Sequence, residues 1–215
     1  MLAQFFLAGY VATVEQWKRF SDEWDTALKN GPKALAYIKM DEAESRKDQF
    51  IGWNEQDRDV KVTELADIII GRSTMFGVSA ILSWGSYQSV QSEYPAHYIN
   101  PYALLFHSII DTAVRRMISL SILDKIEFIF DEQGKDGIKA SESYRLAKDE
   151  LPEDIRNHVS GLPTHRSDRD LLPLQSADMA ARQVRRCFYE NEPHINDISQ
   201  YVFRPLLQRL NLFRT

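Results

Sequence analysis

The chain of 215 residues lacks several features that would define its class at once. Cys187 is its only cysteine, which excludes an internal disulfide and is typical of a reducing cytoplasm. It also has no long hydrophobic run, because the apolar opening MLAQFFLAGYVATV is too short for a membrane helix and lacks the basic start of a signal peptide. We therefore expect a cytoplasmic protein with no membrane partner.

Motifs of common enzyme classes are missing too. The absence of G-x-S-x-G, Walker A and G-x-G-x-x-G motifs argues against serine hydrolases, NTPases and dinucleotide-binding proteins. The five histidines lack HExxH spacing, which argues against zinc. A net charge of -5 argues against a basic surface that coats nucleic acid. Eight arginines nevertheless fall within residues 166–215, and those at 182, 185 and 186 could contact phosphates or form a solvated helix face with local ion pairs.

Strand and helix patterns alternate along the chain, and no repeat or Gly/Ser linker divides it. The spacing of Thr13 and Gln16 predicts a capping box, and Asn54 a second helix start. We predict one α/β domain over residues 1–215. The predicted strands are 4–13, 34–40, 75–84, 126–130 and a short edge strand within 163–174, and the predicted helices begin near residues 14, 55, 101, 138, 173 and 201.

Asp178 lies on the edge of an apolar helical stripe formed by Leu174, Ala177 and Ala181. An isolated buried carboxylate is too costly to keep, so Asp178 must be hydrogen-bonded, paired with a cation or bound to metal. One reading is an ion pair with Arg182, four residues later in the same helix. The other is a metal ligand.

Asp131 follows the apolar run Ile126–Phe130, which is typical of a strand covered on both faces in the middle of an α/β sheet. Ligands bind beyond the carboxyl ends of such strands. If Asp131 and Asp178 converge there, they form a site for Mg²⁺ or Mn²⁺, and two such ions could support phosphodiester cleavage. The alternative is that Asp131 only forms a turn or a cap.

Several segments resemble the bacterial family called domain of unknown function 3800. They are FFLAGYVATVEQWKRFSDEWDTAL, YIKMDEAESRKDQFIGWNEQDRDVKV, INPY, FIFDEQG and LPLQSADMAARQVRR, in that order, of which the L-Q-x-A-D element is the most specific. The resemblance implies a ribonuclease H-like mixed sheet flanked by helices and a metal-dependent nuclease site. It assigns the catalytic, metal-binding carboxylates to Asp131 and Asp178, and Lys39 stands where the family carries His or Lys.

The resemblance also implies a first strand ending in D-E-S-G, which this sequence lacks. We therefore expect an incomplete acidic site and impaired activity, with Lys39 or Arg182 near the substrate phosphate. The partner would be nucleic acid, and a homodimer could complete the sheet. The rivals are a catalytically inactive nucleic-acid-binding or regulatory module and, third, a hydrolase of small phosphorylated molecules.

Overall fold

The computed structural model describes residues 4–72, 75–90, 101–132, 134–148 and 151–189. It confirms a mixed α/β protein with two small sheets flanked by helices, while the ribonuclease H-like topology stays a prediction. None of the helices in these ranges is long and apolar enough to cross a membrane. The helix predicted from residue 201 lies outside the described residues.

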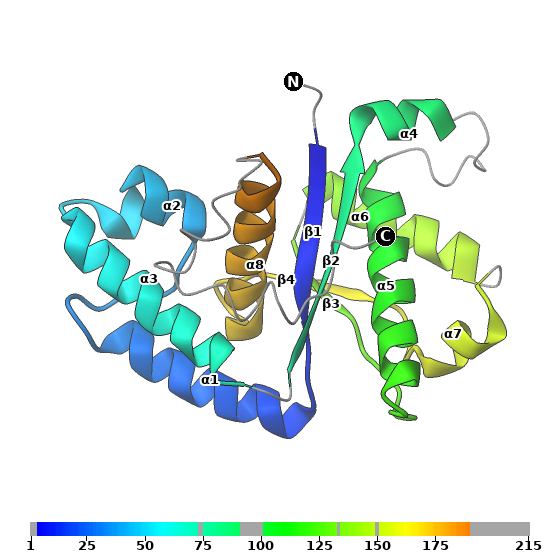
Figure 1. Ribbon diagram of the computed structural model, residues 1–215, viewed down its shortest axis with the longest axis horizontal. Coiled ribbons are helices and arrows are strands. Elements are labelled where there is room, and N and C mark those ends of the chain that lie inside the picture. The colour runs from blue at the N-terminus through cyan, green and yellow to red at the C-terminus, as the bar shows by residue number, and fades with distance from the viewer. Residues whose placement is uncertain (1–3, 73–74, 91–100, 133, 149–150, 190–215) are drawn as a thin grey trace. The chain divides into compact units, whose positions relative to one another are not determined.

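The order of elements largely follows the predicted alternation of strands and helices (Figure 1). In chain order they are β1 (Gln4–Val11), α1 (Val14–Lys29), α2 (Met40–Ser45), the 3-10 helix η1 (Asp48–Phe50), α3 (Glu55–Ile70), β2 (Phe76–Ser83), α4 (Trp84–Val90), α5 (Pro101–Ser119), β3 (Ile129–Asp131), α6 (Gly134–Ala147), α7 (Glu153–His158), β4 (Thr164–Arg166) and α8 (Leu172–Tyr189).

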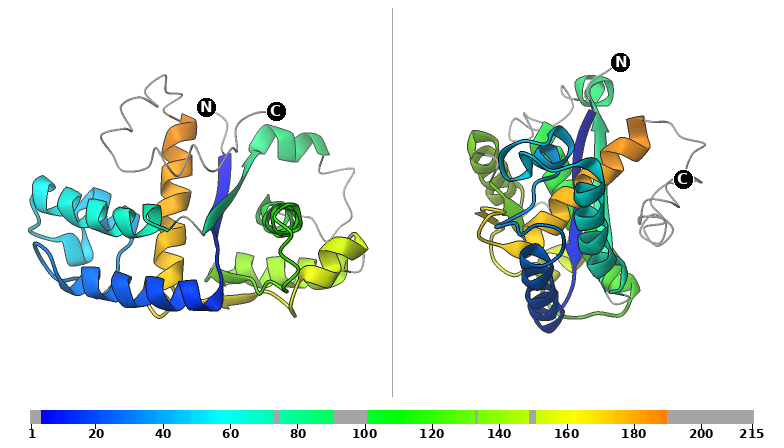
Figure 2. Two further views of the ribbon diagram at one scale, coloured as in Figure 1. Left: turned by 60° about the horizontal axis from the view of Figure 1, so that its bottom comes forward. Right: turned by 90° about the vertical axis from the view of Figure 1, so that its left-hand side faces the viewer.

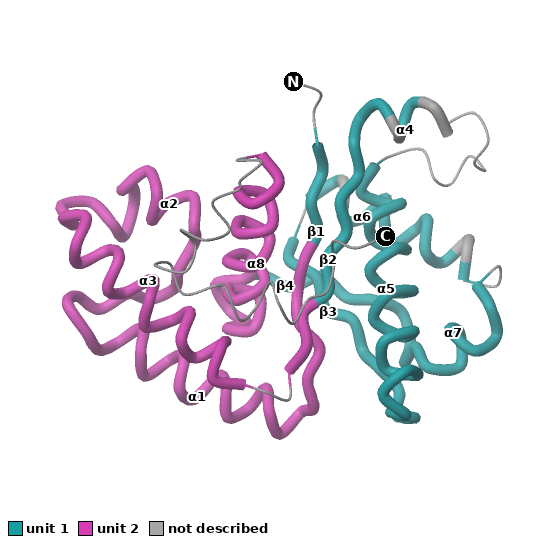
Figure 3. The backbone as a smooth tube through the Cα atoms, in the orientation of Figure 1, with its two compact units in different colours: residues 1–7, 78–167 teal, residues 8–77, 168–215 magenta. Residues whose placement is uncertain are grey.

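The chain divides into two compact units, drawn in different colours in Figure 3. Unit 1 comprises residues 1–7 and 78–167, and unit 2 comprises residues 8–77 and 168–215. Strands β1 and β2 pair in one two-stranded sheet, and β3 and β4 pair in the other. The prediction of a single domain stays a prediction.

Unit 2 is built from helices around one hydrophobic core. Helix α1 packs against α3 and α8, and α8 also contacts α2. Two of the largest buried rings, Phe20 and Trp24, stack at 4.9 Å between centroids. The core cluster consists of Phe20, Trp24, Ala27, Leu28, Leu35, Ile38, Ala43, Phe50, Trp53, Leu65, Ala66, Ile69, Met75 and Met179.

Both ends of α1 are fixed by side chains. The predicted capping box is confirmed, since the Gln16 N–H donates to Thr13 Oγ1 at 3.2 Å and the Thr13 N–H donates to Gln16 Oε1 at 2.8 Å. At the other end, the fully buried Lys61 of α3 donates from Nζ to the carbonyl oxygens of Ala27, at 2.5 Å, and of Asn30. Lys61 thus satisfies carbonyls that a helix end leaves without an intrahelical partner.

The strand predicted for residues 34–40 is wrong, because this segment pairs with side chains rather than with another strand. Gln49 provides both halves of such a pairing: its Oε1 accepts from the Ala36 N–H at 2.7 Å, and its Nε2 donates to the Tyr37 carbonyl at 3.0 Å. Met40 already belongs to α2. The backbone groups of Ala36 and Tyr37 are therefore hydrogen-bonded without a ladder.

In unit 1, α5 packs against α6 and α7, as the left view of Figure 2 shows with α5 seen nearly end-on. Strands β3 and β4 are parallel, and the connection between them contains α6 and α7. In their register, Phe130 lies opposite His165 and Asp131 lies opposite Arg166. A crossover through helices is the usual connection between parallel strands.

The run Ile126–Phe130 forms less strand than predicted. Regular pairing begins at Ile129, and Ile126 makes only an isolated bridge to Val159. Ile126, Phe128 and Phe130 are buried, whereas Glu127 is exposed and Ile129 is 40% exposed. The prediction that both faces are covered is thus wrong: the alternation marks a half-buried strand, and the charged Glu127 already indicated it.

Candidate functional site

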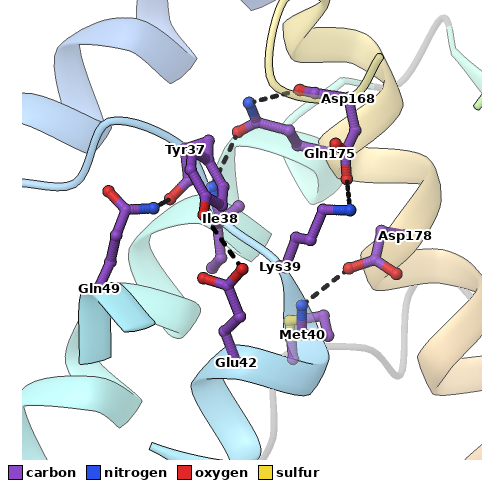
Figure 4. A network of polar contacts seen from close by, with 9 residues as sticks. All are labelled: Tyr37, Ile38, Lys39, Met40, Glu42, Gln49, Asp168, Gln175 and Asp178. Carbon is purple, nitrogen blue, oxygen red and sulfur yellow. Dashed lines mark hydrogen bonds and ion pairs between the residues drawn. The ribbon is translucent and has the colours of Figure 1, made fainter. Parts of the chain in front are cut away.

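Asp178 in α8 caps the start of α2. The Met40 N–H donates to Asp178 Oδ2 at 2.8 Å (Figure 4). Met40 is the first residue of α2, and Lys39, at the cap position, makes no side-chain cap bond. The first N–H groups of a helix lack intrahelical acceptors, so a carboxylate beside them is stabilised. This contact accounts for a carboxylate on the edge of the apolar stripe of α8.

Lys39 forms an ion pair with a residue that the sequence did not single out. Its Nζ lies 3.0 Å from Asp168 Oδ2, and the Asp168 side chain is only 6% exposed whereas that of Lys39 is 36% exposed. Asp168 precedes α8 in the segment RSDRD, whose alternating charges are typical of a solvated loop. No local signal in that segment distinguishes Asp168 from its charged neighbours.

Gln175 connects three segments of unit 2. It is fully buried, its Oε1 accepts from Trp24 Nε1 at 2.9 Å and from the Ile38 N–H at 3.2 Å, and its Nε2 donates to the Asp168 carbonyl at 2.9 Å. Gln175 therefore fixes the segment that carries Lys39 and the residue that pairs with it.

Arg182 pairs with Glu44 of α2. Its Nε donates to Glu44 Oε1 at 2.7 Å, and its Nη2 contacts the other oxygen of the same carboxylate. This two-pronged geometry is the strong form of an arginine–carboxylate pair. Arg182 thus ties α8 to α2, beside the Asp178 contact.

Tyr37 lies next to Lys39 in the same extended segment. Its hydroxyl donates to Glu42 Oε1 at 3.1 Å, and the Arg169 guanidinium lies 4.8 Å from its ring centroid. Burial, and then the Glu42 carboxylate, raise the pKa of the Tyr37 hydroxyl. Two cationic side chains therefore lie at this segment. Arg169 lies over the ring of Tyr37, and Lys39 pairs with Asp168.

Asp131 is the last residue of β3 in unit 1, whereas the sequence predicted that it would lie just beyond the strand. His165, one register position earlier on β4, contacts Ser141 through Nδ1 at 3.3 Å. Burial lowers the pKa of His165, against the opposing effect of Asp131 and then Glu132.

The structure brings three of the four sequence-predicted site residues into unit 2, namely Lys39, Asp178 and Arg182, and places Asp131 in unit 1. The predicted carboxylate pair of Asp131 and Asp178 stays a prediction. Among the described residues, no group of three or more His, Cys, Asp or Glu side chains has a geometry that could hold a metal ion.

Comparisons with protein-family models, with curated proteins and with solved structures found no match for this chain. The family resemblance therefore depends on the sequence motifs alone and stays a prediction. The contacts of Lys39, Asp168 and Asp178 are the structural features that bear on function.

Proposed function

We propose that this chain is a ribonuclease H-like protein derived from a divalent-metal-dependent nuclease or phosphodiesterase, with impaired activity. The observation that carries the proposal is the contact between Met40 and Asp178, 138 residues apart, beside the pair of Lys39 and Asp168. A lysine and two carboxylates from distant segments thus meet in unit 2. Lysine is a common phosphate ligand, and carboxylates bind Mg²⁺ or Mn²⁺.

The proposed roles assign metal binding to Asp131 and Asp178 and phosphate binding to Lys39 and Arg182. A carboxylate has about four lone-pair positions, so Asp178 can accept the Met40 N–H and bind a cation at once. The ion would supply charge stabilisation for the leaving and attacking oxygens of a phosphodiester.

The proposed impairment follows from the internal partners of these residues. Lys39 is paired with Asp168 and Arg182 with Glu44, and the latter pair is two-pronged. A substrate phosphate would have to share each of these cations with a carboxylate, which neutralises part of the positive charge and repels the phosphate. We therefore expect weak substrate binding and slow cleavage.

The test uses labelled single- and double-stranded DNA and RNA in Mg²⁺ or Mn²⁺. The variants are Asp178→Asn, which can still accept the Met40 N–H but carries no charge, Asp131→Asn, and the control Asp67→Asn at an exposed position of α3. We expect weak, metal-dependent cleavage that both site variants abolish and the control retains. Cleavage that survives Asp178→Asn would contradict the proposal.

The second candidate is a catalytically inactive nucleic-acid-binding or regulatory module. It is favoured by the same contacts, because the bonds of Asp178 to Met40 and of Arg182 to Glu44 are complete structural roles. Nucleic-acid binding without cleavage in either metal would support it. If the chain neither binds nor cleaves nucleic acid, the nuclease proposal is contradicted. Only a regulatory role without nucleic acid is then left.

A further inference from the structure

Gln175 is a buried polar side chain with three hydrogen-bond partners, of which Ile38 and Asp168 are drawn in Figure 4. It is 0% exposed, in α8. The indole N–H of Trp24 and the backbone N–H of Ile38 can only donate, so the amide oxygen must face them and the amide nitrogen must face the Asp168 carbonyl. The orientation of the amide is therefore determined by its partners.

Two of the three partners lie beside the pair of Lys39 and Asp168. Ile38 immediately precedes Lys39, and the carbonyl that accepts from Gln175 belongs to Asp168 itself. The amide thus holds the backbone on both sides of the ion pair. Shifting either backbone would change the distance of 3.0 Å between Lys39 Nζ and Asp168 Oδ2.

Helix α8 contacts the same extended segment at a second point. Gln175 accepts from the Ile38 N–H, and Asp178, three residues later in α8, accepts from the Met40 N–H. Residues three apart share a helix face, and alternate N–H groups of an extended segment point to the same side. Lys39, between the two bonds, directs its side chain to Asp168.

We infer that Gln175 is a positioning residue that sets the place of Lys39 relative to Asp168 and Asp178. Its use in phosphate and metal binding rests on the proposed function, whereas the positioning itself rests on the four bonds above. Glutamine suits the position because one side chain must both accept twice and donate once. Glutamate cannot donate to the Asp168 carbonyl, and methionine can neither accept nor donate strongly.

The experiment compares Gln175→Met and Gln175→Glu with a matched control, Trp24→Phe. The control also removes one hydrogen bond of Gln175, but it leaves the bonds of Gln175 to Ile38 and Asp168 in place. The first readout is the rate of reductive methylation of Lys39, followed by mass spectrometry with the exposed Lys18 as internal reference. The second is amide exchange at Met40, whose N–H bonds to Asp178 and not to Gln175.

We expect both Gln175 variants to speed Lys39 methylation and Met40 exchange roughly fivefold to tenfold, the factor that the loss of about one hydrogen bond gives. Exchange at Leu65, in the interior of α3, reports general loosening, so the change in each rate is compared with the change at Leu65 in the same variant. Relative to Leu65, the control should leave both rates unchanged. Should Gln175→Met fail to fold, Gln175→Glu, which retains both acceptor contacts, decides alone.

Unchanged Lys39 and Met40 rates in the Gln175 variants would overturn the inference, and so would an equal rise at Leu65 or in Trp24→Phe. These rates need neither metal nor nucleic acid. Binding of labelled single-stranded RNA in Mg²⁺, measured in parallel, tests the proposed function separately. Absence of binding by the unsubstituted chain would count against that function while the methylation rates still decide the role of Gln175.

Discussion

The two units differ in how their most buried polar side chains are used. In unit 2, Lys61 and Gln175 are fully buried, and each hydrogen-bonds backbone groups of other segments. In unit 1, the Ser143 hydroxyl, the Tyr144 hydroxyl and His165 Nε2 are buried with no hydrogen-bond partner among the described residues. The contrast holds for these individual side chains and not for the whole units. In unit 2, too, the Tyr10 hydroxyl and one Glu42 oxygen are buried with no hydrogen-bond partner among the described residues.

The difference follows from the backbone that each side chain meets. Lys61 and Gln175 lie where regular structure stops, at the end of α1 and along residues 34–39, so backbone groups there need partners. Ser143 and Tyr144 lie within α6 and pack in a helical unit. A buried polar side chain is thus stabilising where it replaces a missing backbone partner, and costly elsewhere. The contrast can be tested by substitution.

Lys61→Met should have the largest effect. It leaves the buried carbonyl of Ala27 and the part-buried carbonyl of Asn30 at the end of α1 without their donor. Because bonds to a charged group contribute more than neutral ones, we expect the free energy of unfolding to fall by about 2–3 kcal/mol. Chemical denaturation measures this, with the exposed Lys18→Met as control. A loss below about 0.5 kcal/mol would show that burying the ammonium costs as much as its bonds return.

Thr13→Ala should have a smaller effect, also in unit 2. It removes the hydroxyl that accepts from the Gln16 N–H at the start of α1. The expected loss in the free energy of unfolding is about 1 kcal/mol. Thr26→Ala, in the same helix, is the matched control, because its hydroxyl only donates back to the Asp22 carbonyl and should cost little. Equal losses for the two variants would contradict a capping role.

The caps show how far the sequence could predict this fold. Thr13 with Gln16, and Asn54, act over three residues within one segment, so spacing alone identifies them. The mixed α/β class and most helices followed for the same reason. The prediction of a strand at 34–40 was wrong. Its pattern correctly indicates an extended segment, but the partners of this segment are the side chains of Gln49 and Gln175 and not another strand. No local pattern identifies such partners.

The candidate site shows the same limit. Asp178 was singled out because a carboxylate beside an apolar stripe requires a partner, but its partner, the Met40 N–H, lies 138 residues away. Asp168 was missed because nothing local distinguishes a buried aspartate from the exposed charges around it. The partners of both residues lie far away in the sequence, and a single sequence does not record such pairs.

His165 allows a test of unit 1 by pH. Because burial lowers its pKa, the unfolded chain binds a proton at a higher pH than the folded one does. Stability should therefore fall as pH drops through about 6.5, the ordinary histidine pKa, and level off once the folded pKa is passed. His165→Asn should remove this part of the pH dependence. Urea denaturation at several values between pH 7.5 and 5 would measure it, in steps of about 0.5 chosen for the histidine range. The prediction would be contradicted if the free energy of unfolding depended on pH in the same way in both proteins.

Tyr144→Phe should have the smallest effect and gives the sharpest comparison between the units. The Tyr144 hydroxyl is fully buried without a partner among the described residues, and burial raises the pKa of Tyr144. Its removal should change the free energy of unfolding by less than about 0.5 kcal/mol, or raise it, since an unsatisfied buried group is lost. Gln175→Met in unit 2 also removes polar atoms from a fully buried side chain at nearly unchanged volume, but it leaves the Ile38 N–H and the Asp168 carbonyl without this partner, so we expect a loss of about 1 kcal/mol or more.

Denaturation of both variants measures the difference directly. If Tyr144→Phe costs as much as Gln175→Met, the Tyr144 hydroxyl has a partner such as a buried water, because only a hydrogen bond would make its removal costly. The polar groups of unit 1 would then be satisfied like those of unit 2, through solvent rather than backbone. If Tyr144→Phe is neutral while Gln175→Met is not, burial alone does not decide the value of a polar group, and its backbone partners do.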